Sequence, residues 1–218
     1  MIKCVNYKKP MFLVLEGIDG AGKGRQRIEL TQILKQKFPG LFSLEFPDHQ
    51  GVIYKNIIKP ALLEKISIPK QAWFPAFALD QILYQDRISK AKNSKEEHFI
   101  CDGYYTTNIV YNALVNKHLS LAKALAFAKD FKIAEADINI FIDVDPQIAL
   151  ARKKIEPGHN EGLDIYERDL KKQQLLRKSY LKMAQDSIFG KWEVVDGNGS
   201  ITEVTETILQ VLIKYNLA

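Results

Sequence analysis

Residues 11–27 read Met-Phe-Leu-Val-Leu-Glu-Gly-Ile-Asp-Gly-Ala-Gly-Lys-Gly-Arg-Gln-Arg. The apolar run at residues 11–15 is too short for a typical helix and predicts a strand that is buried on both faces. A polar stretch that suits a helix follows at residues 25–37. A strand, a glycine-rich loop and a helix in this order are the context that a phosphate-binding loop requires.

The loop itself carries Gly17, Gly20 and Gly22, followed directly by Lys23. Glycine lets the backbone curl until its N–H groups point inward at a polyphosphate. Lys23 would add a point charge for the β- and γ-phosphates, and the helix N-terminus behind it would add a favourable dipole. The alternative is a glycine turn without a ligand, which leaves the entropic cost of these glycines unexplained.

One position departs from the usual phosphate-loop pattern. Gly24 stands where Ser or Thr is expected, so the hydroxyl that commonly binds Mg²⁺ is absent. We therefore expect the metal to be held through water or by another side chain. Asp102, which follows a later predicted strand, is the best candidate, with helix capping as its alternative role.

Composition narrows the function classes further. The chain has 218 residues, the size of one domain with a sizeable core, and no apolar run as long as a membrane span. Residues 1–10 lack the apolar segment of a secretory signal, and Cys4 and Cys101 lack CxxC spacing, so we expect a reduced, cytoplasmic protein. The net charge of +5 suits an anionic substrate such as a nucleotide, while no basic stripe with interleaved aromatics points to nucleic acid.

Four further strands are predicted, at residues 42–46, 98–101, 138–142 and 192–195. Because helical segments separate all five strands, we expect an α/β fold with a five-stranded parallel sheet and helices on both faces. Ligands bind at the carboxyl ends of such strands. That edge would bring together the 17–24 loop, residues 46–49, Asp102 and residues 197–199.

The helical segments are predicted from apolar spacing and from start and stop signals. One ends near residue 58, stopped by Pro60, and residues 70–92 are expected to form one long helix, bent near Pro75. The others are expected at about 105–116, 119–131, 146–154, 165–186 and after Ser200. Asp145-Pro146 and Ser200-x-x-Glu203 are helix-start signals, the second of them a capping box.

The ordered set of motifs resembles a known family. Residues 12–23 are similar to the opening of thymidylate kinases, within the P-loop nucleoside monophosphate kinases. The similarity continues over about residues 11–210, through Phe46-Pro47, Phe77-Ala-Leu-Asp80, Cys101-Asp102-x-Tyr104, Phe141-Ile-Asp-Val-Asp-Pro, Ala149-Leu-Ala-Arg152 and Trp192-Glu-Val-Val-Asp196. The resemblance implies a P-loop nucleotide kinase fold, a single domain over residues 1–218 with a lid at about 155–165. It also implies transfer of the γ-phosphate of ATP to dTMP, with Mg²⁺, by a cytoplasmic enzyme that is usually a homodimer.

The resemblance assigns the donor nucleotide to the glycine loop and to a second loop after the fifth strand. The ATP-binding residues that it implies are Gly17, Ile18, Asp19, Gly20, Ala21, Gly22, Lys23, Gly24, Gly197 and Asn198. The catalytic residues that it implies are Lys23, Arg25, Asp102, Arg152 and Lys154. Arg152 and Lys154 lead into the lid, and Asp102 is also the implied metal-binding residue.

The same resemblance implies an acceptor site. Its residues would be Asp19, Phe46, His49, Phe77, Gln81, Tyr104, Thr107 and Tyr111. Asp19 matches the residue that accepts a hydrogen bond from the sugar 3′-hydroxyl, and Phe77 matches the aromatic that stacks on thymine. Each has a structural alternative, because a loop aspartate can brace its own turn and a helix phenylalanine can belong to the core.

Four arginines of the family are missing near the phosphoryl groups. The residues at these positions are His49, Gln81, Gly103 and Ile165. One well-placed arginine can be worth about 10³–10⁵ in rate, and Arg25 could provide one charge from a new direction. Three interpretations therefore stay open: an active dTMP kinase, a related kinase whose acceptor has shifted because Gln81 replaces a base-reading arginine, and a nucleotide-binding protein with little catalysis.

Overall fold

The computed structural model describes residues 11–94, 97–155 and 164–217. Within these residues the chain forms a five-stranded, all-parallel sheet in the order β2-β3-β1-β4-β5. The strands are β1 (Phe12–Glu16), β2 (Leu41–Glu45), β3 (His98–Asp102), β4 (Ile138–Asp143) and β5 (Trp192–Asp196). The predicted fold class and the five predicted strands are confirmed, with boundaries shifted by at most one residue.

Strand β1 lies at the centre of the sheet, and each of its residues is at most 1% exposed. Leu15 pairs with Asp102 of β3, and Glu16 pairs with Phe141 of β4. Continuous apolar residues on both faces are typical of a strand that has helices on each side. The strand continues one residue beyond the predicted apolar run, because Glu16 keeps its partner in the neighbouring strand.

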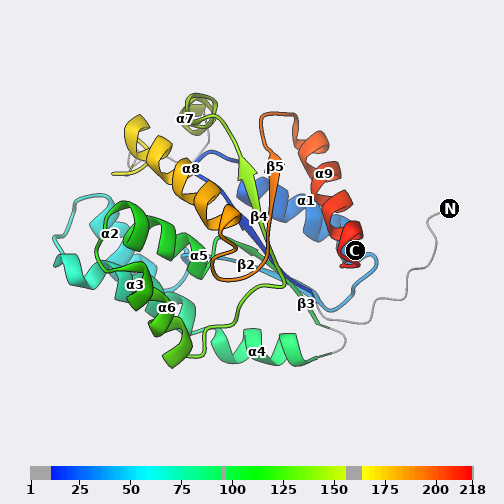
Figure 1. Ribbon diagram of the computed structural model, residues 1–218, viewed down its shortest axis with the longest axis horizontal. Helices are drawn as coiled ribbons and strands as arrows, with labels where there is room; N and C mark the ends of the chain where they lie inside the picture. The colour runs from blue at the N-terminus through cyan, green and yellow to red at the C-terminus, as the bar shows by residue number, and fades with distance from the viewer. Residues whose placement is uncertain (1–10, 95–96, 156–163, 218) are drawn as a thin grey trace.

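Helices cover both faces of the sheet, as predicted (Figure 1). On one face α1 (Lys23–Lys35) packs against α9 (Ile201–Lys214). The other face carries α5 (Tyr105–Asn108), the π-helix η2 (Ile109–Val115) and α8 (Leu170–Gln185). The remaining described helices are η1 (Tyr54–Ile58, a π-helix), α2 (Lys59–Leu62), α3 (Lys70–Ile82), α4 (Gln85–Asn93), α6 (Leu121–Asp130) and α7 (Pro146–Ile155).

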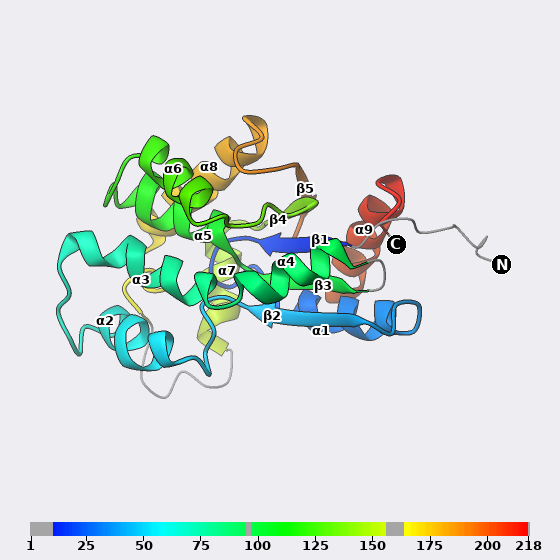
Figure 2. The ribbon, with the colours of Figure 1, turned by 90° about the horizontal axis from the view of Figure 1, so that it is seen from below.

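The strands all run in one direction, so their carboxyl ends gather at one edge. Figure 2 shows the arrowheads pointing towards the side of the molecule that carries α2 and α3. Every strand ends in an acidic residue, and these residues are Glu16, Glu45, Asp102, Asp143 and Asp196. A row of carboxylates therefore crosses the edge at which parallel sheets bind their ligands.

The prediction of one long helix over residues 70–92 is wrong. The chain forms α3 and α4 there, and the break lies at Leu83 and Tyr84 rather than at Pro75. Pro75 lies inside α3 without ending it. At the break the side chain of Gln85 donates to the carbonyl of Gln81 at 3.0 Å, which satisfies a group that the ended helix leaves open.

Two other helix boundaries also differ from the predictions. Pro60 does not stop the helical segment; it lies in the first turn of α2, where a missing N–H costs little. The helix predicted from residue 165 begins at Leu170, because Asp169 caps it by accepting a hydrogen bond from the Lys172 N–H at 3.1 Å. The capping box of Ser200 and Glu203 is confirmed at the start of α9.

Among the described residues, no helix combines the length and the apolar character that crossing a membrane needs. Residues 1–10, with Cys4, lie outside the described part of the chain, and so do residues 156–163 of the predicted lid.

Candidate active site

A cavity of about 1310 Å³ opens at the carboxyl ends of the strands. Residues from five predicted groups line it: the glycine loop, the acceptor residues, the predicted metal-binding residue, the segment before the predicted lid and the loop after the fifth strand. The predicted residues on its surface are Asp19, Gly20, Ala21, Gly22, Lys23, Gly24, Arg25, Phe46, His49, Phe77, Asp102, Thr107, Tyr111, Arg152 and Gly197. Tertiary structure therefore brings together residues from seven separate parts of the sequence.

The glycine loop joins β1 to α1 with a backbone that only glycine adopts readily. Gly20 and Gly22 have φ angles of 82° and 90°. A Cβ at Gly20 would also lie 2.1 Å from the Ala149 carbonyl oxygen. The ammonium group of Lys23 donates to the carbonyls of Gly17 and Ile18, at 2.9 and 3.2 Å, so it lies over the loop. Gly17 and the buried Ile18 shape the loop without lining the cavity.

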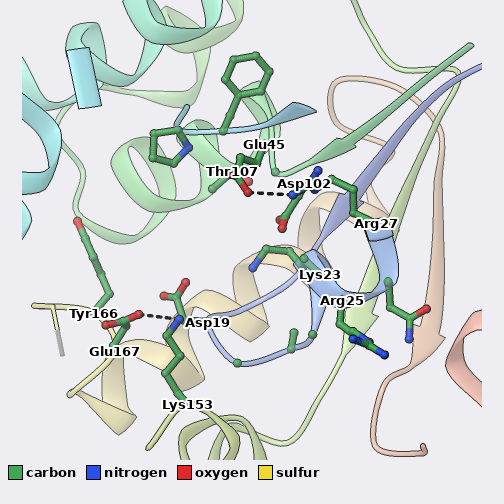
Figure 3. Close-up of a pocket in the computed structure, with 18 of the residues that line it drawn as sticks. Asp19, Lys23, Arg25, Arg27, Glu45, Asp102, Thr107, Lys153, Tyr166 and Glu167 are labelled. Atoms are coloured by element: carbon green, nitrogen blue, oxygen red, sulfur yellow. Dashed lines mark hydrogen bonds and ion pairs between the residues drawn. The ribbon is translucent and has the colours of Figure 1, made fainter. Parts of the chain in front are cut away.

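Asp102 lies directly beside the first turn of α1. Its Oδ2 would be 3.2 Å from a Cβ at Gly24, so the carboxylate occupies the space next to the missing hydroxyl (Figure 3). Burial raises the pKa of Asp102, while the positive charges of Lys23 and Arg27 oppose that shift. The position thus has one anionic oxygen donor close to two cations.

The residues here fit a Mg²⁺ ion that is shared with a nucleotide. Mg²⁺ prefers oxygen ligands, and it is usually held by one or two carboxylates together with substrate phosphates. Asp102 is a carboxylate of this kind, placed next to the phosphate loop. In the described part of the chain no cluster of three or more His, Cys, Asp or Glu side chains could hold a metal by itself. A metal at this site would therefore depend on the nucleotide for its remaining ligands.

Asp19 belongs to the glycine loop, and its side chain contacts residues of η2 and α8 rather than Asp102. Its Oδ2 accepts hydrogen bonds from the Tyr111 hydroxyl at 2.9 Å and from the Gln173 amide at 3.2 Å. Asp164 faces the same carboxylate, and burial together with Asp19 raises the pKa of Asp164. Nearby, Lys153 pairs with Glu167 at 3.1 Å, drawn as a dashed line in Figure 3. Asp19 is thus held in a fixed orientation at the cavity wall.

Two predicted acceptor residues do not lie on the cavity surface. Tyr104 is 1% exposed, and its hydroxyl accepts from the Gln85 amide at 2.8 Å. Gln81 is 2% exposed, and its Oε1 has no hydrogen-bond partner among the described residues. Both side chains are packed behind the cavity wall, while Phe77, one turn before Gln81, is on the wall. Asn108 and Asn112 also line the wall, and sequence reasoning had not selected them.

The loop after β5 is tied to α7 by Arg152. The guanidinium of Arg152 donates to the carbonyls of Gly197 at 3.0 Å and of Asn198 and Gly199 at 3.3 Å. Gly197 lines the cavity, whereas the Asn198 side chain bonds to Asp196 and the Asp145 N–H instead. These contacts hold the 197–199 loop at one end of the cavity.

Arg25 and Lys154 are the most exposed of the predicted catalytic residues. Arg25 pairs with Glu29 of its own helix at 2.8 Å, and its side chain is 57% exposed. Lys154 is exposed near the end of α7 and does not line the cavity. Among the described residues, neither side chain makes a hydrogen bond or an ion pair with Lys23 or Asp102.

Gly103 has a structural reason to be glycine. Its φ is +64°, and a Cβ there would lie 2.9 Å from the Phe46 carbonyl oxygen and 3.1 Å from the Thr107 hydroxyl. An arginine at this position would require the backbone to move. The backbone conformation after β3 is therefore one that suits glycine at residue 103 and not arginine.

Glu16 is a buried carboxylate behind the glycine loop that sequence reasoning did not select. It is 0% exposed and accepts hydrogen bonds from the hydroxyls of Thr106 and, at 2.6 Å, Thr107. Burial raises the pKa of Glu16 from 4.5 to about 7, although both hydroxyls and Lys23 oppose the shift. Glu16 holds Thr107, which lines the cavity.

The Glu16→Gln variant should show a weaker dependence of stability on pH than the wild type. Because the folded pKa is raised, the stabilisation is present below the unfolded pKa of 4.5 and is lost as pH rises through about 7. The fall in unfolding free energy from pH 5 to pH 8 should be smaller in the variant by about 2 kcal/mol. Urea unfolding at both pH values measures this. Glu193→Gln is the control, because Lys214 and Tyr215 lower the pKa of Glu193, so its titration lies below pH 5 and the fall from pH 5 to pH 8 should match that of the wild type.

Comparisons with known proteins identify the family. A family model described as thymidylate kinase matches residues 15–208. The thymidylate kinase of Leptospira interrogans is 26% identical over 208 residues, which cover 94% of this chain and 95% of that protein. That of Caldicellulosiruptor saccharolyticus is 27% identical over 217 residues, covering 94% and 96%. With the glycine loop and Asp102 meeting at the edge of a parallel sheet, these matches show that the chain belongs to the thymidylate kinase family of enzymes.

Proposed function

We propose that this chain transfers the γ-phosphate of ATP to dTMP, forming ADP and dTDP. The proposal is carried by one observation: Lys23, Asp102 and Phe77 face the same cavity. A phosphate loop suits the donor's phosphates, and an aromatic wall in the same cavity suits the acceptor's base. Relatives named thymidylate kinase, matched over 94% of this chain, support dTMP as the acceptor.

In this proposal the glycine loop and Lys23 bind the β- and γ-phosphates of ATP. Phosphoryl transfer requires little covalent chemistry from a protein, so positioning and charge stabilisation account for most of the catalysis. Lys23 lies over the loop at the N-terminus of α1, where the helix dipole also favours anions. Arg152 would hold the loop after β5 at the other end of the donor site.

Asp102 would orient the ligands around the transferred phosphoryl group. Mg²⁺, when bound, would neutralise negative charge that develops there. Asp102 is a half-buried carboxylate next to Gly24 on the cavity surface, so it can accept hydrogen bonds from metal-bound water in place of the absent hydroxyl. Asp19 would accept the sugar 3′-hydroxyl, since Tyr111 and Gln173 already fix its orientation.

A shifted acceptor is the second candidate, and it rests on the amides in the cavity wall. The Asn112 amide donates to Asn108 Oδ1 at 2.8 Å, and both residues line the cavity. The Asn108 amide also donates to the Phe74 carbonyl, and Asn112 Oδ1 contacts the His118 ring, so the amides would exchange these partners for those of a base. Amides both donate and accept hydrogen bonds, which suits a base edge that mixes donors and acceptors, as the cytosine edge does. The sequence suggested that Gln81 replaces an arginine that reads the base. Because Gln81 is buried behind the cavity wall, it supports a shifted acceptor less directly than these two asparagines do.

Turnover of a panel of acceptors tests these alternatives. We expect dTMP to give the highest kcat/KM with MgATP, by about 10-fold over dCMP, because hydrogen-bonding sites reject mismatched edges. A coupled assay of ADP release with dTMP, dUMP, dCMP and dGMP measures it. A higher value for another monophosphate would establish the shifted acceptor, and ATP binding without turnover would establish a binding protein with little catalysis.

We also propose that the chain is a homodimer, with α3 at the interface. The exposed side of the carboxyl-terminal part of α3 is apolar: Leu79 in the helix and Leu83, its C-cap residue, are 43% and 60% exposed. Replacing both leucines by lysine should therefore convert the dimer to a monomer, which sedimentation equilibrium measures. Ile213→Lys, on the exposed side of α9, is the control and should stay dimeric. A monomeric wild type, or a dimeric double variant, would contradict this interface.

Two further proposals concern the cellular location and the domain organisation of the chain. We propose a cytoplasmic protein, because the described cysteine, Cys101, is buried and unpaired. We propose one kinase domain over residues 1–218 with the lid at about residues 155–165, since the sheet and its helices share one hydrophobic core.

A further inference from the structure

Arg27 is an arginine of the cavity that none of the predicted roles includes. It lies on α1, one turn after Lys23, so both side chains leave the same face of the helix. Its side chain is 19% exposed and lines the cavity. Figure 3 shows it extending from α1 past Asp102 towards Glu45 at the end of β2.

The guanidinium of Arg27 is anchored at two points and has donors left over. Nη1 donates to the Ser43 hydroxyl at 3.2 Å, and Nη2 donates to Glu45 Oε2 at 3.0 Å. Nε is buried and has no hydrogen-bond partner among the described residues. A guanidinium has more N–H groups than these two acceptors use. Ser43 and Glu45 thus hold the group in place and leave part of its binding capacity free.

The surroundings of Arg27 differ from those of the other guanidiniums in the cavity. Arg152 is used by three carbonyls of the loop after β5, and Arg25 pairs with Glu29 at the exposed side of α1. Among the described cavity residues, Arg27 is therefore the guanidinium at the ends of β2 and β3. Besides Arg27, three other charged or titratable groups shift the pKa of Asp102 by their charge: Lys23, Glu45 and His49.

Phosphoryl transfer brings two anionic groups together at this place. The acceptor oxygen must lie in line with the γ-phosphate, next to Lys23, and the repulsion between the phosphates must be offset by positive charge. Arg27 lies on the opposite side of Asp102 from the glycine loop. A planar guanidinium can donate two hydrogen bonds to a phosphate monoester, which fixes its direction as well as its distance.

We propose that Arg27 binds the phosphate of the acceptor nucleotide and holds its reacting oxygen beside Lys23 and Asp102. The inference rests on the proposed kinase function and adds a phosphate-binding residue to that site. It makes Arg27 a binding residue for a nucleoside monophosphate and assigns Glu45 the role of a counter-ion that keeps the guanidinium extended.

Binding of a nucleotide and of its nucleoside, measured by calorimetry without ATP, separates phosphate recognition from a structural role. Arg27→Gln should weaken dTMP binding by about 10- to 100-fold, the range expected for a lost charge-assisted hydrogen bond. Thymidine lacks the phosphate, so its affinity should change less than about 2-fold on the same reasoning. Arg87→Gln is the matched control, because Arg87 lies over the Phe42 ring at 4.2 Å, outside the cavity lining. Equal losses for dTMP and thymidine, or an unchanged dTMP affinity, would overturn the proposal.

Glu45→Gln distinguishes a phosphate-binding arginine from one that merely braces β2. The amide oxygen of Gln can still accept from Nη2 and keep the guanidinium extended, while the negative charge close to the incoming phosphate is deleted, so dTMP binding should become tighter. If Arg27 only braces the strand, Glu45→Gln and Arg27→Gln should both lower the melting temperature and both weaken dTMP binding, which would overturn the proposal.

Failure of the proposed function gives a different result from failure of this inference. A wild type that binds another monophosphate of the panel but not dTMP refutes the dTMP assignment alone. The comparison of Arg27→Gln with the wild type then uses that monophosphate and its nucleoside, with the same expected loss. A wild type that binds none of the monophosphates refutes both.

Discussion

Replacing Lys23 by alanine should lower kcat/KM with MgATP and dTMP by about 10³-fold, the scale for a preorganised charge that stabilises a transferring phosphoryl group. In the structure Lys23 donates only to the carbonyls of Gly17 and Ile18, both within the loop. Lys23 itself lines the cavity, so water that enters the cavity can replace the ammonium group. The free energy of unfolding should therefore change by less than about 1 kcal/mol.

Turnover and urea unfolding of the same preparation test this expectation. Lys35→Ala is the matched control, because Lys35 is an exposed lysine in the last turn of the same helix. It should keep wild-type turnover. Near-normal activity of Lys23→Ala would show that the loop does not bind the donor's phosphates, and the phosphate-loop assignment would be wrong.

The second large effect is expected at Asp102. Asp102→Asn should raise the Mg²⁺ concentration for half-maximal activity by about 10- to 100-fold, the usual cost of losing a group that orients metal ligands. The carboxylate is half-buried beside Gly24, and an amide of similar shape keeps the packing while it removes the charge. Since burial disfavours the charged form, the variant should be no less stable than the wild type.

Restoring a hydroxyl at residue 24 provides a rescue experiment. A Cβ there would lie 3.2 Å from Asp102 Oδ2, so Gly24→Ser would place its hydroxyl in the same region. In the Asp102→Asn background it should lower the Mg²⁺ requirement again, whereas Asp196→Asn, at the end of β5, should leave that requirement unchanged. Mg²⁺ titrations of activity and of ATP binding give two independent measurements. An unchanged Mg²⁺ dependence in Asp102→Asn would remove this role from Asp102.

The strands, the glycine loop and the helix caps were predictable because each follows from local rules. Residues 11–15 are apolar throughout, and a strand buried on both faces requires that. Ser200 and Glu203 satisfy each other's backbone N–H groups three residues apart, so the start of α9 is encoded in four residues. The common edge for the glycine loop and Asp102 followed from the direction of parallel strands.

Side-chain direction was less predictable, because packing decides which face of a helix meets the core. Gln81 follows Phe77 by one turn, yet Phe77 lines the cavity and Gln81 is buried behind it. The chain also breaks between α3 and α4, at Leu83 and Tyr84, and no proline or glycine marks that break in the sequence. The hydrogen bond from Gln85 to the Gln81 carbonyl, which accompanies the break, depends on the folded arrangement.

Local sequence rules were thus sufficient for the α/β class, the order of the five strands along the chain, and the loop that carries Lys23. The partners of each charged group depended on tertiary structure. Arg27 and Glu45 are 18 positions apart, and they meet because β2 lies beside α1. From the sequence alone, Gly103 is a position at which the family arginine is missing. The fold shows that a side chain there would clash with the Phe46 carbonyl. Contacts between charged side chains, such as that of Arg27 with Glu45, join different helices and strands. Their distances depend on how the helices pack against the sheet, which local sequence rules do not specify.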